Sequence, residues 1–165
     1  MKTIKLILVS LILASTGFAQ VLTVPKQYTL NTESDFDKYE HDVIECAKFL
    51  MTNLVNQQTA LRNEAAKFLT EYVSKSPTIK VELNQKATPF VSNPELLTVY
   101  LASWVKSYAA QNHINNKEEF TIRAANETLN YYTANKSKIG KVTDIKKFLQ
   151  LQADGKLENH IKSHL

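Results

Sequence analysis

The sequence predicts an all-α protein, a compact bundle of five to six helices with a short extended or two-stranded segment around 78–91. Three observations favour this fold. Apolar residues recur every three to four positions along most of the chain, which is the spacing of one helix face. The prolines and the glycines beyond the N-terminal leader lie near expected element boundaries. About 146 residues, 20–165, remain after the leader, enough to bury roughly two-thirds of the unfolded surface in one core.

The first 19 residues have the pattern of a signal peptide. Two lysines precede a short apolar run, and Gly17 and Ala19 stand at the minus-three and minus-one positions of a cleavage site before Gln20. We therefore expect residues 1–19 to be removed and residues 20–165 to form a single soluble helical domain in the periplasm or outside the cell. No later apolar stretch reaches the roughly 20 residues that span a bilayer, so no transmembrane segment is expected in the mature chain.

The mature chain is nearly neutral and has no means of internal crosslinking. Loss of Lys2 and Lys5 leaves 18 of the 20 basic residues against 16 acidic ones. Arg62 and Arg123 are the sole arginines, although arginine suits bidentate phosphate contacts, so we expect no nucleic-acid binding. With Cys46 as the single cysteine, an intramolecular disulfide is impossible and packing has to hold the fold.

Two helices are predicted in the first half of the chain. The apolar spacing indicates the first within 32–55, with Ser34 and Asp37 as cap-like residues at its start. A second is indicated over 57–74, with Asn56 as its candidate cap. The short connection between them predicts an antiparallel helical hairpin.

Residues 78–91 read differently from their surroundings. Ile79, Val81 and Leu83 alternate with charged residues, which is the period of a strand. A lone strand leaves its backbone groups unpaired, and the other extended candidate is 21–30. The segment is therefore predicted to be either an extended arm or one half of a two-stranded piece.

Asparagine caps mark the next two helices. Asn93, followed by proline and an acidic residue, predicts a third helix that runs to about Gln111. Asn116 and Glu119 have the spacing of a capping box and predict a fourth helix, which fades around 135–140.

Two shorter helices are expected at the C-terminal end. Thr143 and Asp144 are predicted to open a fifth helix, and Gly155 suits its left-handed stop. A last short helix is predicted to hold Leu157 and Ile161.

Local catalytic motifs are missing from the sequence. Two glycines beyond the leader are too few for a phosphate-binding loop, and there is no paired-cysteine metal motif, zinc-protease motif or glycine-flanked nucleophilic serine. We therefore expect no cofactor. Catalytic groups gathered from distant positions, such as the two carboxylates of a glycosidase, leave no such signature.

Tyr100, Trp104 and Tyr108 fall at i, i+4 and i+8 and share one helix face. They are candidates for an aromatic platform that binds a sugar, a peptide or an apolar ligand. The alternative is that the stripe packs in the core.

Two further features are candidate sites. His160 and His164 lie one helical turn apart near Glu158 and are weak metal-ligand candidates that need a third ligand. Cys46 is a reactive thiol beside His41, an intermolecular disulfide partner or a small buried residue.

Lysines gather in the later chain, at Lys136, Lys138, Lys141, Lys146 and Lys147. Acidic residues gather earlier, between positions 33 and 45. The lysines are candidates for contact with an anionic lipid or polysaccharide, and the alternative is a solvated charged face.

The runs SPT (76–78), NPELL (93–97) and DGKLE (154–158) occur in a short, exported, helical chain. In these features the chain resembles a family of small uncharacterised exported bacterial helical proteins. The resemblance implies a helical fold and an exported location, and it implies no function.

The sequence is most typical of an exported, non-catalytic binding or adaptor domain. Its expected partner is an unknown small molecule, a glycan or an envelope protein. One alternative is a small exported hydrolase whose site is assembled from scattered residues. Another is a structural or assembly protein of the envelope, in which the arm around 78–92 adds to a partner's sheet.

Overall fold

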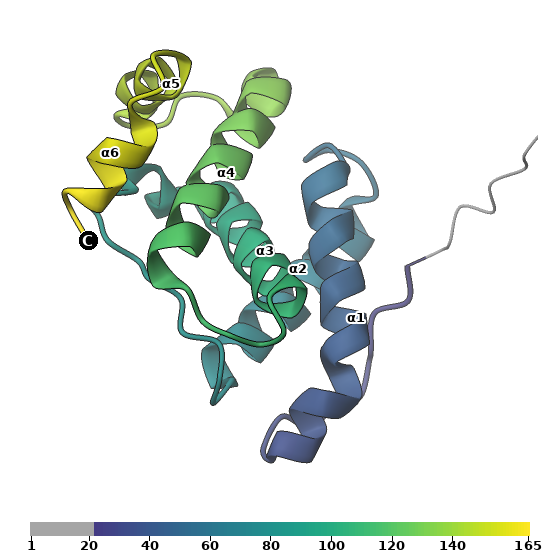
Figure 1. Cartoon of the computed structure of the whole chain (residues 1–165). Helices are drawn as coiled ribbons and strands as arrows, with labels where there is room; N and C mark the ends of the chain where they lie inside the picture. The colour runs from purple at the N-terminus through teal and green to yellow at the C-terminus, as the bar shows by residue number, and fades with distance from the viewer. Residues whose placement is uncertain (1–21) are drawn as a thin grey trace, which may run out of the picture.

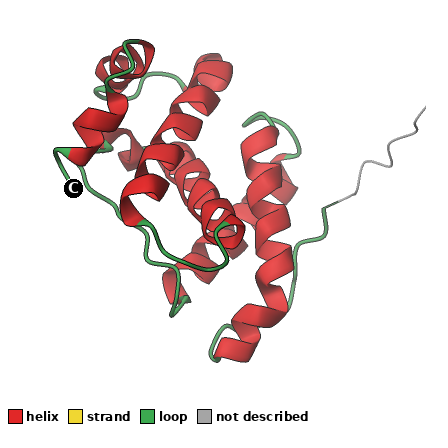
Figure 2. Cartoon of the chain, viewed as in Figure 1, coloured by secondary structure: helices red, strands yellow, loops and turns green. Residues whose placement is uncertain are grey.

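The computed structural model describes residues 22–165, so the predicted signal peptide and its cleavage site lie outside the described residues. Within this range the chain forms six α-helices and one short 3-10 helix, with no strand (Figure 2). The elements are α1 (Glu33–Thr52), α2 (Thr59–Lys75), η1 (Pro89–Ser92), α3 (Pro94–Ala110), α4 (Lys117–Ile139), α5 (Ile145–Ala153) and α6 (Leu157–Lys162). The predicted all-α fold is confirmed.

Helix α3 is the centre of the bundle. It packs against α1 and α2 on one side and against α4 on the other, and α5 and α6 pack against α4 (Figure 1). Ten of its 17 residues are buried, which makes α3 the most enclosed helix. None of the helices within residues 22–165 combines the length and apolarity needed to cross a bilayer.

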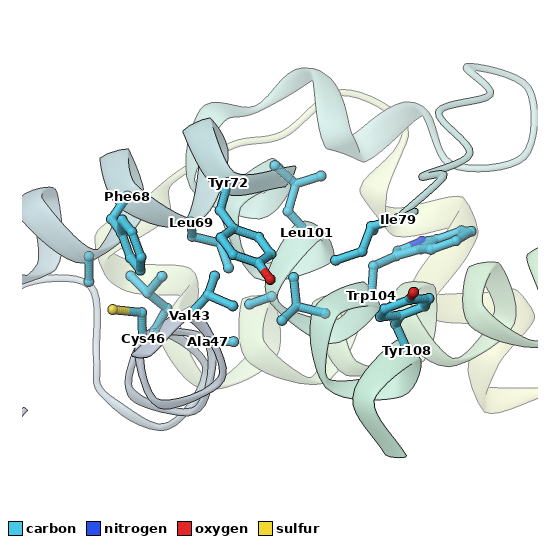
Figure 3. Packing of buried hydrophobic residues seen from close by; sticks show 14 of the residues in the cluster. Val43, Cys46, Ala47, Phe68, Leu69, Tyr72, Ile79, Leu101, Trp104 and Tyr108 are labelled. Atoms are coloured by element: carbon cyan, nitrogen blue, oxygen red, sulfur yellow. The ribbon is translucent and has the colours of Figure 1, made fainter. Parts of the chain in front are cut away.

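The buried apolar side chains form two clusters that both include residues of α3 and α4. The first cluster joins α1, α2 and α3 and contains Phe68 and Trp104 (Figure 3). The second joins η1, α4, α5 and α6 and contains Phe90 and Phe148, whose rings meet edge to face at 5.4 Å. The two clusters therefore bind the N-terminal hairpin and the C-terminal helices to the same central pair.

Helix α1 begins at a different cap from the predicted one. The Thr32 hydroxyl accepts the Asp35 backbone N–H at 3.3 Å, and the Asp35 carboxylate accepts the Thr32 N–H at 3.0 Å. This reciprocal capping box satisfies two of the free donors at the helix start. Ser34 and Asp37, the residues predicted as caps, are already inside the helix.

Helix α2 also begins without the predicted cap. Its N-cap is Gln58, in the left-handed backbone region at φ 48°, and no side chain caps it, so the choice of Asn56 was wrong. The connection over 53–58 nevertheless turns the chain back, and α2 packs along α1 as the predicted hairpin does (Figure 1).

The predicted asparagine caps of α3 and α4 are confirmed. The Asn93 side-chain oxygen accepts the N–H groups of Glu95 and Leu96 at 3.0 and 3.2 Å. The Asn116 oxygen accepts the N–H of Glu119 at 3.2 Å. The Glu119 carboxylate meets the Asn116 side-chain amide rather than its backbone N–H, so this second motif is a cap without the full box.

Helix α5 begins and ends where predicted, but no side chain caps its start. Gly155 adopts φ 68°, and the N–H groups of Gly155 and Lys156 donate to the carbonyls of Gln152 and Leu151 at 3.1 and 2.8 Å. These two bonds define a Schellman motif. Asp144, predicted to help open the helix, lies in the left-handed region and makes no side-chain cap.

The segment before η1 is an irregular arm, so the two-stranded alternative is wrong for residues 22–165. Side-chain donors from elsewhere hold its backbone: the Tyr100 hydroxyl donates to the Glu82 carbonyl at 2.9 Å, and the Asn115 amide donates to the Thr78 carbonyl at 2.7 Å. The extended segment was predicted to run to position 91. The structure instead forms the 3-10 helix η1 at its end. The arm is folded back on its own domain.

Candidate functional site

The aromatic stripe of α3 is part of the core. Tyr100 and Trp104 are fully buried, and Tyr108 is 8% exposed. Trp104 meets Phe120 edge to face at 5.3 Å, and Figure 3 shows Trp104 and Tyr108 among the other buried side chains. The three residues therefore offer no platform to a ligand, and core packing is the correct interpretation of the stripe.

The two C-terminal histidines lie side by side with their ring planes tilted by 40°. The rings of His160 and His164 are 4.3 Å apart, and His160 also meets Phe148 edge to face at 5.2 Å. Burial lowers the pKa of His160 below its usual value, and nearby positive groups add to this shift. Within residues 22–165 no three histidine, cysteine or acidic side chains are grouped as metal ligands, so the third ligand that this pair needs is not beside it.

Cys46 is a core residue. Its side chain is fully buried in the first cluster, near Phe68 (Figure 3). Burial raises the pKa of the thiol to about 12, with Asp42 and Glu45 contributing. A thiol that stays protonated and covered is a poor nucleophile, so the small apolar interpretation holds.

The largest hollow described in the molecule lies between the C-terminal half of α4 and the start of α5, with a volume of about 1130 Å³. Other hollows along the described chain measure between about 180 and 360 Å³. We call this hollow the α4–α5 groove. Its lining residues are Tyr132, Thr133, Ala134, Lys136, Ser137, Gly140, Lys141, Val142, Asp144, Ile145, Lys146, Lys147 and Leu149. Its volume is slightly above the range of small-molecule sites, roughly 300–1,000 Å³.

The floor of the groove is apolar and anchored in the second cluster. Tyr132 and Ile145 are buried, while Val142 and Leu149 are half-buried and pack against the same cluster. The Tyr132 hydroxyl donates to the Gly140 carbonyl at 3.0 Å, which fixes the turn that leaves α4. The floor is therefore built on ordered helices and a pinned turn.

The rim of the groove is positively charged. Lys136, Lys141, Lys146 and Lys147 are exposed, and none of them forms an ion pair with a carboxylate of residues 22–165. Asp144 is the one acidic residue in the lining. The arrangement can attract an anion while the floor shelters an apolar group. Lys138, also predicted in this lysine group, is exposed but does not line the groove.

A buried polar network, which the sequence analysis missed, joins α2, α3 and α4. Arg62 is 3% exposed. Its guanidinium pairs with the Glu95 carboxylate and donates to the Tyr131 hydroxyl at 2.8 Å and to the Asn53 carbonyl at 3.1 Å. Burial is the main cause that raises the pKa of Tyr131.

A sequence signal for this network existed. Arg62, Ala65, Leu69 and Tyr72 are spaced by three or four residues and are all buried, so the arginine continues the apolar face of α2. A charged side chain on an inward face requires a partner, and Glu95 provides it. We assign this network a structural role because its side chains form ion-pair and hydrogen-bond contacts with one another.

Comparison with known proteins found no matching family model, curated protein or solved structure. The functional argument therefore depends on the geometry of the α4–α5 groove.

Proposed function

We propose that this chain is a non-catalytic binding protein and that the α4–α5 groove is its ligand site. The observation that carries the proposal is the combination, in the largest described hollow, of a buried apolar floor with an unpaired positive rim. Binding sites are typically concave, mostly apolar and equipped with a few polar groups that orient the ligand. The leader pattern of residues 1–19 favours a place of action outside the cytoplasm.

The groups that line the groove favour binding over hydrolysis. Hydrolysis by paired carboxylates needs two acidic groups that face the same bond. The groove lining contains Asp144 alone, and Asp144 is exposed. Its other charged groups are lysines, which suit recognition of an anion.

Filling the groove tests the proposal. N-phenyl-1-naphthylamine is a neutral dye whose fluorescence rises in an apolar site, and we expect saturable binding to the mature protein. Ser137 is an exposed residue of α4 that lines the groove, so Ser137→Trp places a bulky ring in it. This variant is expected to weaken dye binding by about tenfold or more because the ring occupies the ligand's volume.

The matched control is Ser74→Trp, the same change at an exposed position of α2 outside the groove. It should leave the dissociation constant of the dye unchanged. Equal dye binding by wild type and Ser137→Trp would refute the groove as the ligand site, and so would an equal loss in both variants.

A further inference from the structure

The proposed function leaves the chemistry of the ligand open. Building on that function, we infer that the α4–α5 groove takes a single-chain amphiphile with an anionic head, either a carboxylate or a phosphate monoester. The hydrocarbon chain lies on the floor, and the head lies at the lysine rim. The inference depends on two independent features of the groove, its apolar lining and its charge.

The apolar feature accounts for the chain. Val142 and Leu149 are half-buried, so each leaves part of its apolar surface facing the groove, next to the buried Tyr132 and Ile145. Covering such surface with hydrocarbon stabilises a complex by roughly 25 cal/mol per Å² of apolar area removed from water, before the costs of association. A purely polar ligand would gain nothing from this floor.

The charge feature accounts for the head. Some lysines of the described chain pair with carboxylates, as Lys75 does with Glu71 at 2.8 Å and Lys117 with Glu82 at 2.9 Å, and others are unpaired; the rim lysines differ from these others in lining one groove together. The rim lysines have no such partner, so their charge is available to a ligand. Lysine stems also cover apolar surface while their ammonium groups reach outward, which suits the boundary between a chain and its head.

The two features together separate this ligand class from others. A neutral lipid would use the floor and leave the lysines unused. An anionic polysaccharide or an acidic peptide would use the lysines and leave the floor exposed to water. An amphiphile with an anionic head uses both, and its single chain fits one groove between two helices.

Displacement of the bound dye measures the head-group preference. Decanoate, decyl phosphate and 1-decanol have the same chain length and differ in the head. At low ionic strength we expect both anions to displace the dye at concentrations about tenfold below that of the alcohol, with the gap narrowing as salt screens the lysines. The tighter of the two anions then distinguishes a carboxylate ligand from a phosphate ligand.

Paired lysine variants locate the preference. In the double variant Lys141→Gln with Lys146→Gln, the anions are expected to lose their advantage over the alcohol, with each displacing concentration corrected for the variant's own dye affinity. The control variant, Lys80→Gln with Lys138→Gln, removes the same charge at exposed positions outside the groove and should keep the full preference.

The outcomes separate the two proposals. Dye binding in the groove with equal displacement by the anions and the alcohol would overturn the anionic head and leave the binding function intact. Displacement by heparin fragments or polyglutamate as effective as that by decanoate would overturn the amphiphile in favour of a polyanion. No dye binding by the wild-type protein would overturn the proposed function and this inference with it.

Discussion

At the scale of single residues, Arg62 shows how one side chain can join three helices. Its charge is almost fully buried on α2, and its partners come from α3, from α4 and from the connection after α1. Such a group is costly to bury unless it is paired and hydrogen-bonded. The network therefore specifies how the two sides of the bundle meet.

Removal of the Arg62 side chain should strongly destabilise the fold. Arg62→Ala removes the guanidinium that donates to Glu95, Tyr131 and the Asn53 carbonyl. The Tyr131 hydroxyl, with its single proton, is then the remaining donor to Glu95 and Asn53 within this network. We expect the free energy of unfolding to fall by about 2–3 kcal/mol, below the roughly 3–5 kcal/mol of a fully buried pair, because the Glu95 side chain is 24% exposed. Urea denaturation followed by circular dichroism measures this loss.

Arg123 provides the control, since it is the other arginine and forms an exposed i, i+4 pair with Glu119 at 2.8 Å. Arg123→Ala should cost at most about 0.5 kcal/mol. Similar losses in the two variants would show that burial of Arg62 does not distinguish it from a surface charge.

At the scale of the elements, the starts of α3 and α4 and the end of α5 were predictable from single residues, whereas the start of α1 was not, although the Thr32 and Asp35 side chains cap it. Asn93 and Asn116 cap with their side-chain oxygens, and Gly155, which has no side chain, adopts the left-handed backbone that ends α5. Gln58 and Asp144 begin α2 and α5 through a left-handed backbone without side-chain caps. The sequence indicated Asp144 as the start of α5 and missed Gln58 as the start of α2, because glutamine is not a typical capping residue.

The sequence period left two alternatives for the segment before η1, and the structure shows the arm rather than the strand. The alternation of Ile79, Val81 and Leu83 has a physical source, because Ile79 is buried, Val81 is half-buried and Leu83 is 53% exposed. Alternation of apolar and charged residues does not by itself mean that a segment pairs with another strand. The side-chain bonds from Tyr100 and Asn115 hold the arm's backbone in its place.

The left-handed stop of α5 leads to a testable prediction. Gly155→Ala should lower the free energy of unfolding by about 1 kcal/mol, because an L-residue at φ 68° is strained. A Cβ added there would have no neighbour within 4 Å, so the cost is conformational rather than steric. Gly155→Asn should cost less, since asparagine tolerates this region better. Thermal unfolding of the wild type and the two variants measures these differences. A Gly155→Ala variant as stable as wild type would contradict the account.

At the scale of the whole molecule, two apolar clusters and one polar network hold the described chain together without a crosslink. The groove lies at the outer edge of the second cluster, where α5 meets the end of α4. Ligand contacts there touch the floor without opening the central pair of helices. A binding site at this edge is thus compatible with a rigid interior.

The candidate site was half visible in the sequence. The lysines between positions 136 and 147 stood out as a charge run, and four of the five line the groove. The floor did not stand out, because Tyr132 and Leu149 belong to different helices and meet only through the turn that Gly140 and Tyr132 fix. Sequence periodicity identifies the apolar face of a single helix. A groove between helices depends in addition on how the two helices are placed relative to each other.

The most direct test of the account is a two-dimensional ¹H–¹⁵N NMR titration of the mature protein with decanoate. We expect the shift changes to concentrate between residues 132 and 149 and to saturate with a single dissociation constant. Changes centred instead on the hollow of α1 around His41 and Glu45, or spread evenly over the helices, would contradict the assignment of the α4–α5 groove as the ligand site.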